Sequence, residues 1–219
     1  MQNIVDSFQF ILRGGFMMYP LLLSGLIALT VVIERIFVLK FRLGSSGELT
    51  PKIIQAIRKG DLQGALQGLT DVNSPVANVL AAGLRDSQAP IEEIEISMQN
   101  QAEMWVPRIE KRLEILDTVI TAAPLMGLLG TITGMMASFQ VLSEKGVNEP
   151  HAITGGVAEA LIATATGLVI ALLSLLAYNY FNSRVKILIF QMESAGAQLI
   201  EALRYLHRHQ QSPQKSPQL

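Results

Sequence analysis

Three long stretches without a charged side chain dominate the pattern of hydrophobic and polar positions along the chain. They cover residues 16–33, 118–143 and 160–183, and they are 18, 26 and 24 residues long. A bilayer core of about 30 Å needs roughly 20 apolar residues at 1.5 Å per residue, so each stretch is long enough to cross it as a helix. The pattern predicts an all-α integral membrane protein with three transmembrane helices.

A secretory signal peptide is the alternative interpretation of the first stretch. Such a peptide has a basic leader and a cleavage site of small residues. Here only Arg13 precedes the stretch closely, Asp6 lies upstream, and the charged pair Glu34 and Arg35 follows it. These features favour a helix that stays in the membrane.

The segment between the first two stretches has helical periodicity. Thr50 and Pro51 are typical of a helix start, and Gly60 ends that helix before a second one. A third helix is predicted from about Pro75 to Arg85. From Pro90 the apolar pattern continues without a turn signal into the second stretch, which predicts one helix of about 50 residues, roughly 75 Å long. We expect Pro107 and Pro124 to bend this helix.

Positive charges set the expected orientation. Basic residues follow the first and third stretches and precede the second, so the positive-inside rule places the N-terminus in the periplasm and the C-terminus in the cytoplasm. We expect an N-terminal periplasmic segment at 1–15, transmembrane helices at 16–39, 116–143 and 152–183, a cytoplasmic helical domain at 40–115, a periplasmic loop at 144–151, a cytoplasmic helix at 184–206 and a disordered tail at 207–219.

Small residues recur every three or four positions in the second and third spans. Helices in lipid associate through close backbone contact along such stripes, because burial against each other brings them no hydrophobic gain. The alternative is that glycine and alanine are simply common in membrane helices. The first span has no such stripe, and its leucines at 21, 22, 23, 26 and 29, with Ile27, are predicted to face lipid. The predicted stripes are Ala123, Gly127, Gly130, Gly134 and Ala137, and Gly156, Ala160, Ala163, Gly167, Ala171 and Ser174.

Glu159 is the acidic residue that the pattern singles out. If the third span begins near Ala152, this carboxylate lies about two turns inside it, where a charge costs on the order of 3 kcal/mol unless it meets a partner or a wet cavity. One chain with three spans can hardly enclose a cavity, so several copies or a partner helix are expected around Glu159. The alternative is that the helix starts at Ala160 and leaves an ordinary interfacial carboxylate.

Hydroxyl groups lie at similar depth in both small-residue spans. Thr131, Thr133 and Ser138 lie in the second span, and Thr164 and Thr166 lie in the third. The plain interpretation of each is a hydrogen bond to the carbonyl of its own helix four residues earlier.

Composition narrows the function classes. Seventeen basic residues against eighteen acidic ones give a net charge of −1, which is not the basic balance of a nucleic-acid-binding protein. Without cysteine the chain forms no disulfide and no thiolate metal site, and we predict no metal and no cofactor. Neither HExxH nor GxSxG occurs and no nucleophile–base pair is visible, so an enzyme is not expected.

The segments APLMGLLGTITGMMASF (123–139) and GGVAEALIATATGLVIALLSLLAYN (155–179) resemble the two signature spans of the MotA/TolQ/ExbB proton-channel family. Three spans and the chain length point to its ExbB/TolQ branch. The resemblance implies a homo-oligomeric ring, typically a pentamer, in the bacterial inner membrane. Such a ring surrounds two copies of a one-span ExbD/TolR-like partner, whose membrane aspartate carries protons, and it energises a TonB/TolA-like transducer.

By the same resemblance Glu159, Thr131 and Thr164 match the ion-pathway residues of the family. Ala171-Leu172-Leu173 stands where relatives usually have a proline, so the third helix is expected to be straighter. A flagellar- or gliding-type stator subunit and a non-conducting membrane scaffold are the alternatives; flagellar stators have four spans.

Overall fold

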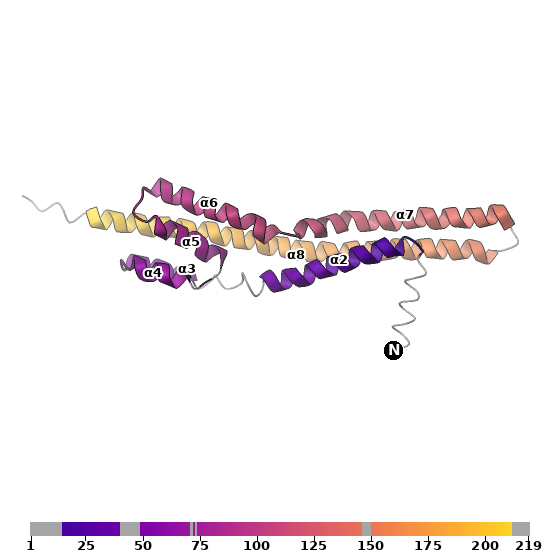
Figure 1. Ribbon diagram of the computed structural model, residues 1–219, viewed down its shortest axis with the longest axis horizontal. Coiled ribbons are helices and arrows are strands. Elements are labelled where there is room, and N and C mark those ends of the chain that lie inside the picture. The colour runs from indigo at the N-terminus through magenta and orange to yellow at the C-terminus, as the bar shows by residue number, and fades with distance from the viewer. Residues whose placement is uncertain (1–14, 40–48, 71, 73, 146–149, 212–219) are drawn as a thin grey trace, which may run out of the picture. The chain divides into compact units, whose positions relative to one another are not determined.

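The computed structural model of the chain describes residues 15–39, 49–70, 72, 74–145 and 150–211. Predictions about 1–14, 146–149 and 212–219 lie outside these residues. Throughout the described part the only regular elements are helices, which confirms the all-α class (Figure 1). The helices are α2 (Met18–Phe37), α3 (Leu49–Arg58), α4 (Leu62–Thr70), α5 (Pro75–Arg85), α6 (Ile91–Glu110), α7 (Leu113–Lys145) and α8 (Pro150–Gln211).

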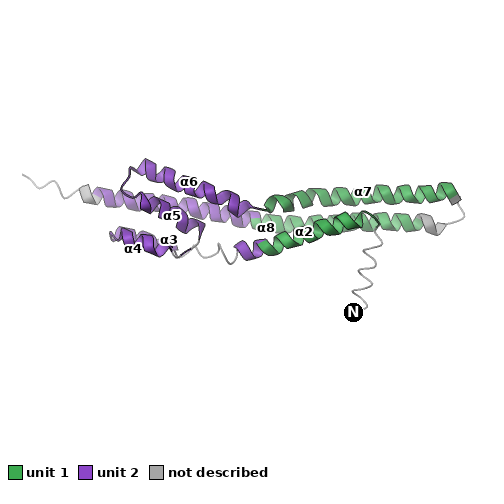
Figure 2. Cartoon of the chain, in the orientation of Figure 1, with its two compact units in different colours: residues 1–34, 112–181 green, residues 35–111, 182–219 purple. Residues whose placement is uncertain are grey.

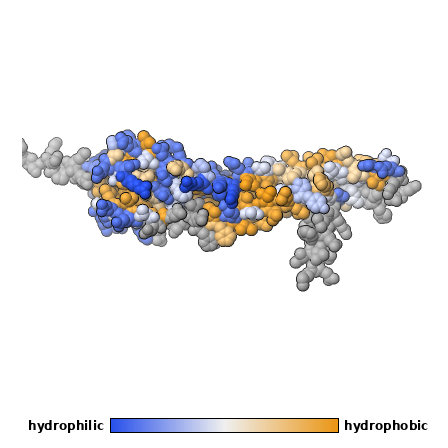
Figure 3. Space-filling model, in the orientation of Figure 1, coloured by the Kyte–Doolittle hydropathy of each residue, from blue (hydrophilic) through white to orange (hydrophobic). Residues whose placement is uncertain are grey.

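Three helical stretches in the described residues are long and apolar enough to cross a membrane, as predicted. They are Met18–Phe37, Ile91–Glu144 and Thr154–Arg208. The chain divides into two compact units, unit 1 with residues 1–34 and 112–181 and unit 2 with residues 35–111 and 182–219 (Figure 2). On the face that Figure 3 draws, hydrophobic residues gather over unit 1 and hydrophilic residues prevail over unit 2. Unit 1 therefore carries the membrane-spanning character.

In unit 1, α2 buries one face against the other two helices. Met18 and Leu21 are completely buried, and a side chain added at Gly25 would contact Ile170 of α8 at 3.2 Å. The predicted lipid-facing positions Leu23, Leu26, Ile27 and Leu29 are exposed. The same prediction is wrong for Leu21, because it falls on the buried face of α2 with Met18, three residues earlier.

Unit 2 is held together by short helices whose apolar faces are buried. Ile53, Ile54 and Ile57 of α3 are buried as the periodicity predicts. Gly60 ends this helix with φ of +85°, a conformation that glycine adopts without steric cost. The hydroxyl of Ser74 accepts a hydrogen bond from the Ala77 N–H at 3.1 Å and caps α5.

The predicted single helix from Pro90 through the second span is interrupted in the structure. α6 ends at Glu110 and α7 begins at Leu113, and Arg112 between them has φ of +66°. A buried arginine of α2 helps to end α6, because Arg35 Nη1 donates to the Ile109 carbonyl at 2.9 Å. The last carbonyls of a helix have no donor within it, and this long-range donor is invisible to local periodicity.

The C-terminal helix is longer than expected. α8 is continuous from Pro150 to Gln211, so residues 207–211 of the predicted disordered tail are helical. It also continues without interruption through Ala171, Leu172 and Leu173.

Candidate functional site

The α7–α8 contact in unit 1 is so close that backbone atoms fill the space a side chain would need. A Cβ atom added at Gly127 would lie 3.0 Å from Thr164 Cα, and one at Gly134 would lie 2.9 Å from the Gly156 carbonyl oxygen. At Gly167 it would lie 2.5 Å from the Ala123 carbonyl oxygen. Glycine is therefore required at these positions for the two backbones to approach.

The other small residues of the stripes lie mostly in the same contact. Ala160 and Ala163 are buried, and a Cβ at Gly130 would lie 2.6 Å from that of Ala163. One at Gly156 would overlap the Ser138 hydroxyl. Ala137 is exposed, so the stripe on α7 does not include it.

Thr164 is the hydroxyl residue that bridges the two helices. Its Oγ1 donates to the Gly127 carbonyl at 2.9 Å, across 37 positions of sequence. The glycine at 127 makes this possible, because no Cβ separates the carbonyl from α8. Thr164 thus departs from the plain interpretation of an own-helix bond.

The remaining hydroxyl groups bond to their own helix. Thr166 Oγ1 donates to the Ile162 carbonyl four residues earlier at 2.8 Å, as expected, whereas Thr131 Oγ1 donates to the Leu128 carbonyl, three residues earlier, at 2.6 Å. Thr133 and Ser138 also donate to carbonyls of their own helix. A threonine that donates its proton in this way keeps oxygen lone pairs that can accept another hydrogen bond.

Glu159 lies inside α8 and not at its beginning. It is the ninth residue after Pro150, about two and a half turns along the helix. Its side chain is half-buried, and a Cβ atom added at Gly15 would overlap its Oε1 atom. The start of the first span therefore lies directly against this carboxylate.

The antiparallel register places Thr131 and Glu159 on neighbouring turns of the α7–α8 contact. Gly134 faces Ala160 and Gly127 faces Thr164, so Thr131 lies between these two levels and Glu159 lies next to the Gly134–Ala160 level. No hydrogen bond among the described residues joins Glu159 to either threonine. The three predicted residues thus lie near each other along one helix pair, without direct bonds between them.

Sequence reasoning missed Gly15 as a neighbour of Glu159. Gly15 has φ of +73°, and it precedes α2 by three residues. A Cβ atom added at Gly130 of α7 would lie 3.4 Å from the Cβ atom of Met17, which directly precedes α2. The start of the first span therefore also lies against α7. The pair Gly14-Gly15 in the sequence signals a turn, but its partner across 144 residues carries no local signal.

Among the described residues, no group of three His, Cys, Asp or Glu side chains is placed to hold a metal ion. His207 is half-buried on α8.

Comparison with known proteins gives consistent similarities. A sequence model of the MotA/TolQ/ExbB proton channel family matches residues 71–194. An ExbB-like biopolymer transport protein of Synechocystis sp. is 31% identical over 175 residues, which are 78% of this chain and 83% of that protein. The Tol-Pal system protein TolQ of Pseudomonas aeruginosa is 33% identical over 130 residues, 54% of this chain and 56% of that protein. The biopolymer transport protein ExbB of Neisseria gonorrhoeae is 30% identical over 138 residues, 63% of this chain and 60% of that protein.

Proposed function

Because the chain belongs to the MotA/TolQ/ExbB proton channel family, in its ExbB/TolQ branch, we propose that it is a motor subunit driven by the proton motive force. Several copies, typically five, form a ring in the bacterial inner membrane. The ring surrounds two copies of a one-span ExbD/TolR-like partner and energises a TonB/TolA-like transducer. The N-terminus lies in the periplasm and the C-terminus in the cytoplasm.

Glu159 carries this proposal. An ionised carboxylate inside a membrane span costs on the order of 3 kcal/mol, and such residues usually mark ion or proton pathways. Its position two and a half turns into α8, half-buried beside Gly15, is the supporting observation. A scaffold would gain nothing from keeping a carboxylate there.

In the proposed mechanism, a proton that binds to an acidic residue of the partner helix drives the rotation. Glu159 offers a titratable group, and Thr131 and Thr164 offer hydroxyl oxygens, to a protonatable acid on the partner helix. Protonation of that acid removes the cost of moving its charge past the apolar wall, so proton entry gates rotation. A membrane potential contributes about 2.3 kcal/mol per charge per 100 mV, which is enough to bias each step.

Proton flux in liposomes tests the proposal. The chain is purified with its co-expressed one-span partner, and flux is followed with a pH-sensitive dye after a potassium diffusion potential is imposed. Glu159→Gln keeps the size of the side chain and is expected to lower the flux at least tenfold. Glu144→Gln is the matched control, because Glu144 is exposed near the end of α7 and bonds to Gln140.

Equal flux in wild type and Glu159→Gln would contradict the role of Glu159. Absence of flux in the intact wild-type complex would favour the scaffold. A flagellar- or gliding-type stator would instead show its activity with a motility protein as the partner.

A further inference from the structure

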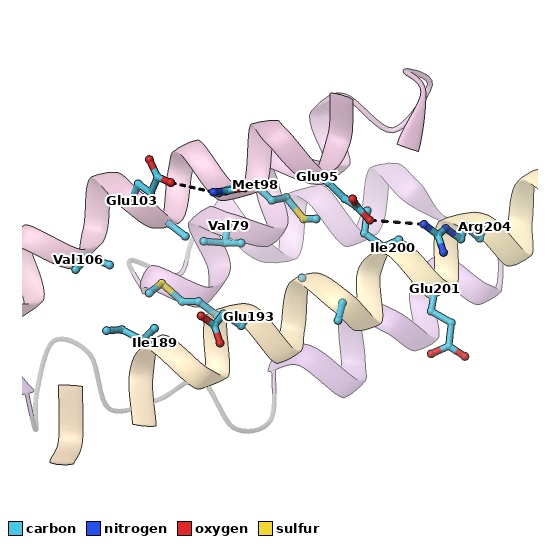
Figure 4. A pocket seen from close by; sticks show the side chains of 15 residues that line it. Val79, Glu95, Met98, Glu103, Val106, Ile189, Glu193, Ile200, Glu201 and Arg204 are labelled. Atoms are coloured by element: carbon cyan, nitrogen blue, oxygen red, sulfur yellow. Dashed lines mark hydrogen bonds and ion pairs between the residues drawn. The ribbon is translucent and has the colours of Figure 1, made fainter. Parts of the chain in front are cut away.

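An open groove runs between α6 and α8 in unit 2 (Figure 4). Its volume is about 700 Å³, within the range of ligand-sized pockets. Val79 of α5, Met98 of α6 and Met192 of α8 form its floor and are buried. The apolar surface that the described residues leave partly uncovered belongs to Val106 of α6 and Ile189 of α8, which are half-buried.

The rim of this groove is acidic. Glu95 and Glu103 of α6 and Glu193 and Glu201 of α8 are all exposed, against one basic residue, Arg204. Arg204 pairs with Glu95 at 3.6 Å, and Figure 4 shows this pair reaching from one helix to the other. Within the described part of the chain, Glu193 and Glu201 form no ion pair. The groove thus favours an occupant that covers apolar surface and carries positive charge.

The outward side of α3 has the complementary charge. Lys59 directly follows the last residue of α3, and its N–H donates to the Gln55 carbonyl at 3.2 Å, which continues the helical turn. Lys52, seven residues earlier, therefore lies on the same side, with Gln55 between them. These three residues and Arg58 are exposed, and α3 itself contains no acidic residue. We name Lys52, Gln55, Arg58 and Lys59 the basic face of α3.

The basic face and the groove lie at the same level along α8. Pro51 at the start of α3 lines a small cavity with Gln191 and Gln198 of α8, and Arg58 at its end lines another with Tyr205. The α8 residues that line the groove lie between Ile189 and Arg204. Figure 1 draws α3 and α6 on opposite sides of α8. Copies of unit 2 related by rotation about an axis parallel to this part of α8 would bring these two surfaces together at equal height.

We propose that the basic face of α3 in one copy docks over the α6–α8 groove of a second copy. This contact rests on the proposed assembly of several copies. The aliphatic stems of the lysines and the arginine cover the apolar floor, while their charged ends reach the glutamates of the rim. Because the two surfaces differ, the contact is head-to-tail and repeats from copy to copy until a ring closes.

Disulfide cross-linking in native membranes tests the contact, because the chain has no cysteine of its own. The double variant Gln55→Cys with Ala197→Cys places one thiol on the basic face and one in the groove, without changing any charge. Mild oxidation is expected to give a ladder of linked species longer than a dimer. In the matched control, Ala197→Cys is replaced by Asn100→Cys, which lies on the other side of α6 from the groove, and at least tenfold less ladder is expected.

Charge exchange tests the chemistry of the contact. Glu103→Lys with Glu193→Lys, or Lys52→Glu with Lys59→Glu, is expected to lower the yield of the ladder at least tenfold. All four changes in one chain restore opposite charges across the contact and are expected to restore the ladder. Glu93→Lys, which adds a charge on the side of α6 away from the groove, is the control and leaves the yield unchanged.

Three other outcomes would contradict the proposed contact. Linked dimers without longer species would indicate a symmetric interface. A multimer seen by native mass spectrometry, with normal proton flux but without the ladder, would overturn the contact and leave the proposed function intact. A chain that is monomeric in the membrane would overturn both.

Discussion

The hydroxyl of Thr164 donates to the carbonyl oxygen of Gly127 at 2.9 Å, which joins α8 to α7 within their close backbone contact. The glycine permits the approach and the threonine supplies the donor. Neither residue would make this contact without the other.

Replacing Thr164 with valine should therefore weaken the helix pair. The side chain keeps its shape and loses the donor, and the expected loss of unfolding free energy is about 1 kcal/mol. Thr166→Val is the control, because that hydroxyl bonds only to the Ile162 carbonyl of its own helix. Reversible unfolding in detergent measures both variants, and equal effects would contradict the bridging role. Thr164→Ser keeps the hydroxyl and should behave like wild type.

Gly167→Ala should be one of the most damaging single-methyl changes in the spans. Its new Cβ would lie 2.5 Å from the Ala123 carbonyl oxygen, so the backbones must separate, at a cost of about 2 kcal/mol. Gly155→Ala is the control, because a Cβ there has no neighbour within 4 Å. The control should be neutral or slightly stabilising, since alanine favours helices. Thermal unfolding measures both variants, and equal melting temperatures would show that the close approach is unimportant.

Gly130→Leu should disrupt assembly as well as folding. A Cβ at this position already meets that of Ala163 at 2.6 Å, and a leucine would force α7 away from α8. Native mass spectrometry should show loss of the assembled species. An oligomer of unchanged size would contradict this expectation.

Arg35→Gln should destabilise the chain more than Arg112→Gln. Arg35 is buried with 1% exposure and donates to the Ile109 carbonyl, so its loss should cost about 3 kcal/mol. Arg112 pairs with Glu34 at 3.1 Å, but its side chain is 44% exposed, and such pairs contribute less than about 1 kcal/mol. Chemical denaturation measures both variants. A larger effect at Arg112 would show that its ion pair, and not the buried donor, holds the end of α6.

Gly60→Ala tests the turn between α3 and α4. The φ of +85° disfavours any residue with a Cβ, although the space around Gly60 is open. The expected cost is about 1 kcal/mol, and Gly60→Asn should cost less, because asparagine tolerates this conformation. An alanine variant as stable as wild type would show that the turn relaxes.

The sequence by itself determined the class of the protein and the position of its membrane helices. Span length is read from uninterrupted apolar residues, and helix starts and ends such as Pro75 and Gly60 are local signals. The depth of Glu159 in its helix followed from the same apolar pattern. These features depend on neighbours in sequence, so periodicity alone predicts them.

Only the tertiary structure decided which groups meet. The Gly127 carbonyl accepts a hydrogen bond from Thr164 and not from Thr166. The way in which α7 and α8 cross sets which residues face each other, and composition does not reveal it. The buried donor Arg35 ends α6 from 74 residues away, and Gly15 lies against Glu159 from the other end of the chain. Contacts between residues far apart in sequence arise from packing, and a single sequence carries no local trace of them.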